Sequence, residues 1–310
     1  MFLYYLILII SSALGAVNSA WLMKKYQLAA GTGLFANVVL MIINGFLSAL
    51  VAAVVLVTGH EAFETTPYSL AIALATVLCA AVSTLTILKA YEKGQVAIAN
   101  IFSVMGSILL SCAWGILFLE ETLTARQTAA IALIVAAILL FTVKPEKKAS
   151  RPPAADSGET GARQGGHRLL LLYFLIFFSA GFVNILSKVH QVEKVHATVN
   201  TLSFSIWIGL IRAILFSLLF PFLKRKCHPL PKLPRAAYGY ASAVAIVGGG
   251  CYIITLIVAV VLPLTITTPL STGISMGLTS FLPWLLYREK LSRQEIAGIL
   301  LSITGILLYT

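Results

Sequence analysis

Residues Gly15–Asn18 read Gly-Ala-Val-Asn, and residues Gly181–Asn184 read Gly-Phe-Val-Asn at an offset of 166. Working outward, Glu121–Thr124 (Glu-Thr-Leu-Thr) and Glu289–Ser292 (Glu-Lys-Leu-Ser) form a second pair at an offset of 168. Both pairs occupy equivalent places in the two halves of the chain. A repeated unit of this length predicts an internally duplicated architecture.

The composition predicts that this duplicated unit lies in a membrane. Apolar residues make up 59% of the chain and charged residues 11%, whereas a soluble domain carries about 25% charged residues. A helix needs about 20 apolar residues to cross the hydrocarbon. On that basis we predict ten spans, at roughly 2–23, 33–58, 68–90, 96–119, 127–144, 168–189, 197–222, 236–260, 262–287 and 293–309.

The number of spans in each copy predicts how the copies are oriented. Residues 1–144 and 168–310 each hold five spans, and the Lys-, Pro-, Ala- and Gly-rich segment 145–167 reads as a flexible linker. Because five is odd, the second copy enters the membrane from the opposite side. The predicted fold is an all-α polytopic membrane protein with ten transmembrane helices in two inverted five-helix repeats, whose site lies at the repeat interface.

The distribution of basic residues predicts the topology. Of the 22 Lys and Arg residues, 18 fall in odd-numbered connections, three in even-numbered ones, and Arg212 inside a span. The positive-inside rule then places the odd connections in the cytoplasm. We therefore expect an integral protein of the bacterial inner (plasma) membrane with both termini extracytoplasmic.

Several of these motifs are similar to those of the drug/metabolite transporter superfamily, and within it of the EamA-type ten-helix transporters. The resemblance rests on the two five-helix repeats, on the turn Lys89–Gly94, and on fourth spans rich in small residues that run into Glu-x-Leu-Thr/Ser. The spans that follow are of the type of Ala129–Leu140 and Ala297–Leu308. The resemblance implies a transporter whose central cavity is lined by spans 1, 3, 4, 6, 8 and 9. It does not identify the substrate.

A polar stripe occurs at equivalent positions of the two fourth spans, with spacings of 3, 4 and 4 that place its members on one helix face. Its residues are Asn100, Ser103, Ser107 and Ser111 in one copy, and Thr268, Ser271, Ser275 and Thr279 in the other. Such a face either packs closely against another helix or lines a cavity. Pro269 favours the cavity, because proline frees a backbone carbonyl beside these hydroxyls.

Other candidate site residues are amides, aromatic residues and one charge. Asn18 and Asn184 occupy equivalent places and either contact substrate or bond across the repeat interface. Trp114 and Tyr252 are candidate cavity walls, although aromatic residues near span ends also serve as interfacial anchors. Arg212 either binds an anionic group or braces the repeats, since its counterpart at an offset of 168 is another polar residue, Asn44.

The Glu-x-Leu-Thr/Ser signatures are interpreted as helix starts rather than proton sites. Thr124–Gln127 and Ser292–Glu295 fit the capping-box pattern. Glu121 and Glu289 precede those helix N-termini, where the helix dipole favours negative charge.

The residues that the spans lack narrow the function. No Asp, Glu or His lies in the middle of a span, and we find no catalytic set, metal-ligand set or nucleotide loop. We therefore expect no enzyme activity and no cofactor. The partners expected are the lipid bilayer and a small-molecule metabolite, and no nucleic acid. The predicted function is secondary transport of a neutral, zwitterionic or anionic metabolite by alternating access. The alternatives are a lipid-linked sugar flippase and, more distantly, an integral-membrane enzyme.

Overall fold

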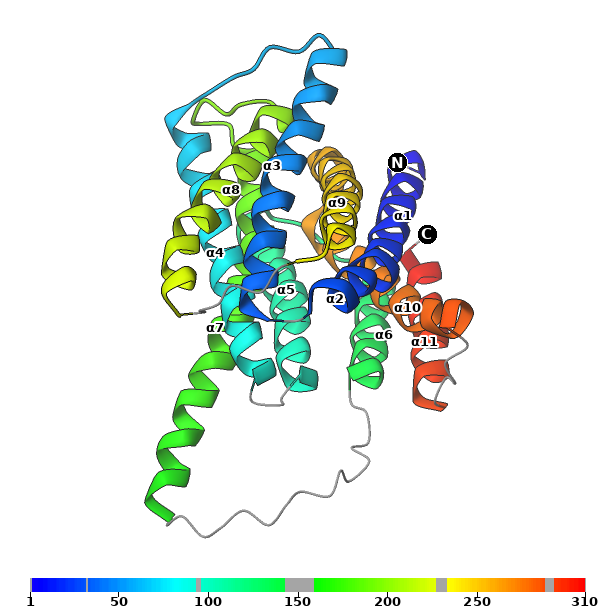
Figure 1. The fold of residues 1–310 in the computed structure, drawn as a ribbon. Coiled ribbons are helices and arrows are strands. Elements are labelled where there is room, and N and C mark those ends of the chain that lie inside the picture. The colour runs from blue at the N-terminus through cyan, green and yellow to red at the C-terminus, as the bar shows by residue number, and fades with distance from the viewer. Residues whose placement is uncertain are drawn as a thin grey trace.

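A computed structural model describes residues 2–31, 33–92, 96–142, 159–226, 233–287 and 293–309, which contain helices and no strand. Figure 1 shows the helices side by side in a bundle. The first half consists of α1 (Phe2–Val17), the π-helix η1 (Asn18–Met23), α2 (Lys24–Ala30), α3 (Leu34–Thr58), α4 (Pro67–Glu92), α5 (Val96–Phe118) and α6 (Ala125–Thr142). The second half consists of α7 (Glu159–Val192), α8 (Thr201–Lys226), α9 (Arg235–Val261), α10 (Leu264–Tyr287) and α11 (Arg293–Tyr309).

The ten predicted spans are confirmed, because α1, η1 and α2 together form one span. Seven segments of the described chain are long and apolar enough to cross a membrane, and α6 and α11 are shorter apolar helices. The helix α10 is not one of the seven. It carries eight Ser and Thr residues, which lower its hydropathy and mark it as a helix that faces other protein groups.

The two halves pack according to a pseudo-two-fold pattern. Equivalent helices pair with each other across the halves, α3 with α8 and α6 with α11. Non-equivalent contacts also occur in matching pairs. The helix α5 packs on α7 as α10 packs on α1, and α4 packs on α7 as α9 packs on α1, η1 and α2. This pattern is the one that an inverted repeat produces.

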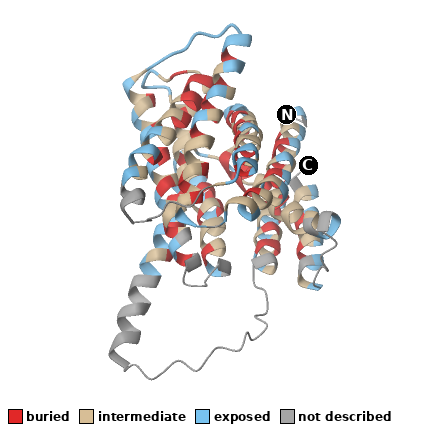
Figure 2. Cartoon of the chain, viewed as in Figure 1, coloured by how far each residue is buried: buried red, intermediate tan, exposed pale blue. Residues whose placement is uncertain are grey.

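The outer surface is apolar. Figure 2 shows buried residues between the helices, with exposed and intermediate residues along the outward faces. Many of the exposed residues are large and hydrophobic, for example Leu117, Leu218 and Leu307, at 72%, 64% and 63% exposed. Apolar surface of this extent is unfavourable in water, and it matches a lipid environment.

Two features distinguish the ends of the first span of each half. In the first half, the π-helix η1 separates α1 from α2, and α2 lies at an angle to α1 (Figure 1). The helix α2 ends at Gly31, whose φ of 81° suits glycine. In the second half, α7 begins at Glu159 inside the segment 145–167 predicted as a linker, and runs to Val192 without a break. Residues 143–158 lie outside the described residues.

Candidate functional site

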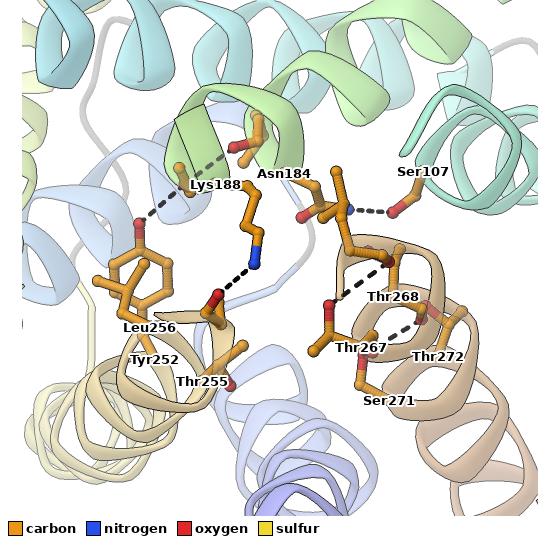
Figure 3. Close-up of a pocket in the computed structure, with 14 residues that line it drawn as sticks. Ser107, Asn184, Lys188, Tyr252, Thr255, Leu256, Thr267, Thr268, Ser271 and Thr272 are labelled. Carbon is orange, nitrogen blue, oxygen red and sulfur yellow. Dashed lines mark hydrogen bonds between the residues drawn. The ribbon is translucent and has the colours of Figure 1, made fainter. Parts of the chain in front are cut away.

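A cavity of about 180 Å³ lies between α5, α7, α9 and α10 (Figure 3). These are the fourth, sixth, eighth and ninth spans, so both halves contribute to it. Its walls carry nine polar or charged side chains among apolar ones. The lining residues are Ser107, Val183, Asn184, Ser187, Lys188, Tyr252, Thr255, Leu256, Ala259, Leu264, Thr267, Thr268, Ser271 and Thr272, with Tyr252 adding a phenol.

Hydrogen bonds between helices fix several of these side chains. The amide of Asn184 on α7 donates to the hydroxyl of Ser107 on α5 at 2.6 Å. The hydroxyls of Ser187 on α7 and Tyr252 on α9 are 3.3 Å apart. Figure 3 shows Asn184, Ser107 and Tyr252 among the residues that line the cavity. A polar side chain in the membrane is stable only when it is bonded, and these bonds hold the amide and the phenol in place while the Asn184 carbonyl oxygen remains as an acceptor.

The α10 wall presents hydroxyl oxygens. Ser271 donates to the carbonyl of Thr267 at 2.7 Å, and Thr267 donates to the carbonyl of Leu264 at 3.5 Å. A hydroxyl that donates back to its own helix still has lone pairs that accept. This wall therefore offers acceptors for hydroxyl or ammonium groups of a ligand.

A lysine crosses one end of this cavity. Lys188 is 5% exposed, and in Figure 3 its side chain extends from α7 toward α9. Its ammonium donates to the carbonyl of Ala259 and, at 2.8 Å, to that of Leu262. These carbonyls end α9, where the partial negative charge of the helix dipole stabilises a cation.

A carboxylate from the first half caps the N-terminus of α10. The two carboxylate oxygens of Glu121 accept the backbone N–H groups of Leu264 at 2.7 Å and Thr265 at 2.9 Å. The expectation that Glu121 acts on its own following helix is therefore wrong, because it caps α10 instead. The predicted capping box of α6 is confirmed by reciprocal bonds between Thr124 and Gln127 at 3.0 and 3.3 Å. Glu289 and Ser292 lie outside the described residues.

A larger cavity of about 580 Å³ adjoins the first, and Lys188 lines both. It extends toward the connections that follow α5 and α7, which belong to the even-numbered face of the bundle. Trp114 stacks on Phe118 with ring centroids 4.2 Å apart. The walls consist of Trp114, Phe118, Leu119, Glu121, Lys188, Val189, Val192, Glu193, Lys194, Val261 and Pro263. Lys188 thus belongs to the walls of both cavities.

The structure brings together part of the predicted site. Ser107, Asn184, Tyr252, Thr268 and Ser271 line the smaller cavity, and Trp114 lines the larger one.

The rest of the two polar stripes lies outside both cavities. Ser275 donates to the carbonyl of Ser12 on α1 at 3.4 Å, and Thr279 donates within α10 at 2.8 Å. Ser111 is fully buried, whereas Asn100 and Ser103 are half-buried. Each stripe is longer than the cavity, and among the residues outside it Ser275 contacts α1. The structure thus places Ser107, Thr268 and Ser271 at the cavity and the other members of the stripes away from it.

Asn18 and Arg212 also lie outside the cavities. The amide of Asn18 donates to the carbonyl of Val244 on α9 at 3.1 Å. Arg212 donates to the amide oxygen of Asn44 at 3.0 Å, so the two equivalent polar residues bond directly across the α3–α8 interface. This geometry corresponds to the bracing interpretation of Arg212.

The carbonyl that Pro269 frees was expected to line the cavity, but in the structure it contacts another helix. Proline at position 269 leaves the carbonyl of Thr265 without its helical partner. The thiol of Cys112 on α5 lies 3.9 Å from that carbonyl and donates to it. The freed group therefore joins α10 to α5 rather than facing the cavity.

Sequence reasoning did not single out Lys188, which the count of basic residues assigned to an even-numbered connection although the predicted span 168–189 contains it. The helix α7 continues to Val192, so Lys188 lies inside the helix, four residues from its end. One signal was present in the sequence. Lys188 follows Asn184 by four residues and therefore shares its helix face. Glu121 offered no comparable signal, because its partner belongs to the other half of the chain.

Comparisons with known proteins agree with this architecture. Residues 167–310 match the EamA-like transporter family. A solved crystal structure of a protein at 14% sequence identity is aligned over 98% of this chain and 97% of that chain, with a TM-score of 0.74, which shows the same fold. No curated protein sequence matches the chain significantly. The second half of this integral membrane protein, residues 167–310, is therefore similar to the EamA-like transporter family of the drug/metabolite transporter superfamily.

Proposed function

We propose that this protein is a secondary transporter that moves a small polar metabolite, neutral, zwitterionic or anionic, by alternating access. The observation that carries the proposal is the cavity between α5, α7, α9 and α10, in which polar groups from both halves converge. A polar cavity among membrane-spanning helices is costly unless it serves a polar solute. Its position at the repeat interface is where inverted-repeat transporters bind substrate.

Differences between the halves support alternation. Asn184 bonds to Ser107, whereas their counterparts do not bond to each other. Asn18 donates to Val244 and Ser275 donates to Ser12. When one half closes and the other opens, Asn18 and Ser275 take up the arrangement that Asn184 and Ser107 have here. Asn184 and Ser107 then take up the arrangement of Asn18 and Ser275. In the second state, we expect Asn18 to approach Ser275 and the cavity to adjoin the opposite face.

Transport is tested with purified full-length protein in liposomes loaded with a metabolite panel that includes amino acids, sugars and nucleosides. We expect exchange of at least one solute without ATP. Thr268→Leu places an isobutyl group in the cavity and should abolish exchange. Thr304→Leu is the matched control, because Thr304 lies on an exposed face of α11. Equal activity of the two variants would remove the cavity from the transport path.

Alternation is tested with cysteine pairs in a background without native cysteines. Asn184→Cys with Ser107→Cys should cross-link in the state described above, and Asn18→Cys with Ser275→Cys in the other state. Each cross-link should stop exchange, and reduction should restore it. If both cross-links form in one molecule at the same time, the two pairs are close in a single state, and the proposed alternation between two states is wrong.

A further inference from the structure

We propose that Lys188 binds a carboxylate of the transported molecule, so that the substrate carries a single negatively charged group. This inference rests on the transport function proposed above and assigns its charge-recognising residue. Lys188 lies where the two cavities adjoin, so a solute that passes between them passes its ammonium group.

The bonds of Lys188 keep it charged and leave it able to bind. Its ammonium has three donors, and the carbonyls of Ala259 and Leu262 accept two of them. Among the described residues, no acceptor is found for the third. Carbonyl dipoles compensate a buried charge only partly, and a carboxylate forms stronger, charge-assisted bonds with ammonium than a neutral carbonyl does. A substrate carboxylate therefore gains from this lysine even where a carbonyl must be exchanged.

The other cation inside a span is not placed for this role. Arg212 lines neither cavity, and its guanidinium bonds to Asn44 between α3 and α8. Of the described Lys and Arg residues, Lys188 alone lines the smaller cavity. We therefore assign anion recognition in the smaller cavity to Lys188.

The local charge balance favours one negative charge over two. Glu121 lines the adjoining cavity and interacts electrostatically with Lys188, so the cation is already partly balanced. Charge interactions are strong where water is excluded, and a dianion such as a phosphate monoester would leave uncompensated charge. A carboxylate matches the site.

The remaining walls describe the rest of the ligand. Thr268 and Ser271 on α10 and the Asn184–Ser107 pair lie on the other side of the cavity (Figure 3). They offer acceptors for an ammonium or hydroxyl group. A cavity of about 180 Å³ suits a molecule of a few carbon atoms. The class that fits is a small amino or hydroxy acid.

The test measures thermal stabilisation and liposome exchange for matched acids and carboxamides. The probes are L-alanine, L-serine, L-threonine, L-leucine, L-lactate and D-glycerate, each beside its own carboxamide, with 3-phosphoglycerate as the polyanion and glycerol and D-ribose as neutral solutes. We expect wild-type protein to bind at least one acid and to reject its carboxamide and the polyanion. Lys188→Gln keeps amide donors for the α9 carbonyls, and it should weaken acid binding on the order of 10- to 100-fold. Lys188→Arg should retain part of the affinity.

Arg126→Gln is the control, because Arg126 is exposed and lines neither cavity. Equal binding of an acid and its carboxamide by wild type would overturn the proposal without any variant. Unchanged acid affinity in a folded Lys188→Gln protein would do the same. Exchange of glycerol or ribose with no acid bound would overturn the role of Lys188 while leaving the transport function intact. Failure to exchange any solute, acid or neutral, would contradict the transport function itself.

Discussion

The crossing of α5 with α7 is tight, whereas the equivalent crossing of α10 with α1 is loose. A Cβ added at Gly181 on α7 would lie 2.6 Å from the carbonyl oxygen of Gly106 and 2.5 Å from Leu110 on α5. The counterpart Gly15 has no such neighbour within 4 Å. The same difference appears one turn further, where Asn184 reaches α5 but Asn18 reaches α9.

Identical residues in the two copies therefore occupy different environments. Both copies carry Gly and Asn at these positions, so the difference comes from the backbone around them. Asn18 begins the π-helix η1, whose wider turns change the direction in which side chains point, whereas Asn184 lies in the uninterrupted helix α7. The repeat specifies which residues are polar and which are small. The local helix geometry decides what they contact.

The largest expected effect comes from the two glycines. Gly181→Leu should prevent assembly of a folded protein, because its side chain meets the backbone of α5 and overpacking of this kind costs about 3 kcal/mol or more. Gly15→Leu should leave a folded, monodisperse protein. Size-exclusion profiles and melting temperatures in detergent measure both. Equal tolerance at the two positions would remove the difference between the crossings.

The next effect concerns Arg212 and Asn44, which are equivalent positions bonded to each other. Arg212→Gln should lower stability by about 1–3 kcal/mol, the range for hydrogen bonds to a charged group, with ligand affinity retained. Exchanging the residues, as Asn44→Arg with Arg212→Asn, should recover part of the loss because the positions face each other across the pseudo-two-fold axis. Lost affinity with an unchanged melting temperature would instead place Arg212 in the binding site.

A smaller effect on stability is expected at the asparagines. Asn184→Ala and Asn18→Ala should each lower stability by about 1 kcal/mol, typical of one hydrogen bond. If the halves exchange arrangements, both variants should slow solute exchange to a similar extent, although only Asn184 lines the cavity. Wild-type exchange rates in Asn18→Ala, with slow exchange in Asn184→Ala, would show that the halves keep fixed roles.

The smallest effect concerns the connection after α7, which has no counterpart after α2. Backbone N–H groups of Val195 and His196 and the hydroxyl of Tyr68 donate to Glu193 and lower the pKa of its carboxyl from 4.5 to about 2. A lowered pKa contributes stability that is present above about pH 4.5 and lost as the pH falls toward 2. The melting temperature of wild type should therefore fall slightly more between about pH 6 and pH 3 than that of Glu193→Gln. Equal falls would show that these bonds do not stabilise the connection.

Most of the fold follows from patterns that the sequence carries directly. Apolar length and polar breaks predict the spans, even at Leu262-Pro263, where α9 ends and α10 begins at Leu264. The offset of the repeat also identifies Asn44 as the polar counterpart of Arg212, and the structure shows that these two residues bond to each other. Both succeed because hydropathy and repetition are properties of the chain alone.

The site is predicted less completely because it depends on contacts between distant segments. The helix α7 extends past the first charged residue, since the carbonyls that accept from Lys188 belong to α9, 71 and 74 residues away. The sequence predicts that this span ends near residue 189, but it does not indicate the α9 carbonyls that Lys188 contacts. The polar stripe on α10 predicts a face but not its partner, so Thr268 lines the cavity while Ser275 contacts α1.

The pairing of α6 with α11 means that α6 cannot pack fully until the end of the chain has been synthesised. During translation, α6 enters the membrane well before α11 has been made, and until then its inward face, with Ile134 and Ile138 fully buried in the finished protein, has no permanent partner. The same delay applies to α3, which waits for α8. Until the second half is made, α3 and α6 therefore lack the helices with which they pair in the finished protein. Ribosome-bound chains that end before α11 should be sensitive to proteases and to capture by membrane chaperones.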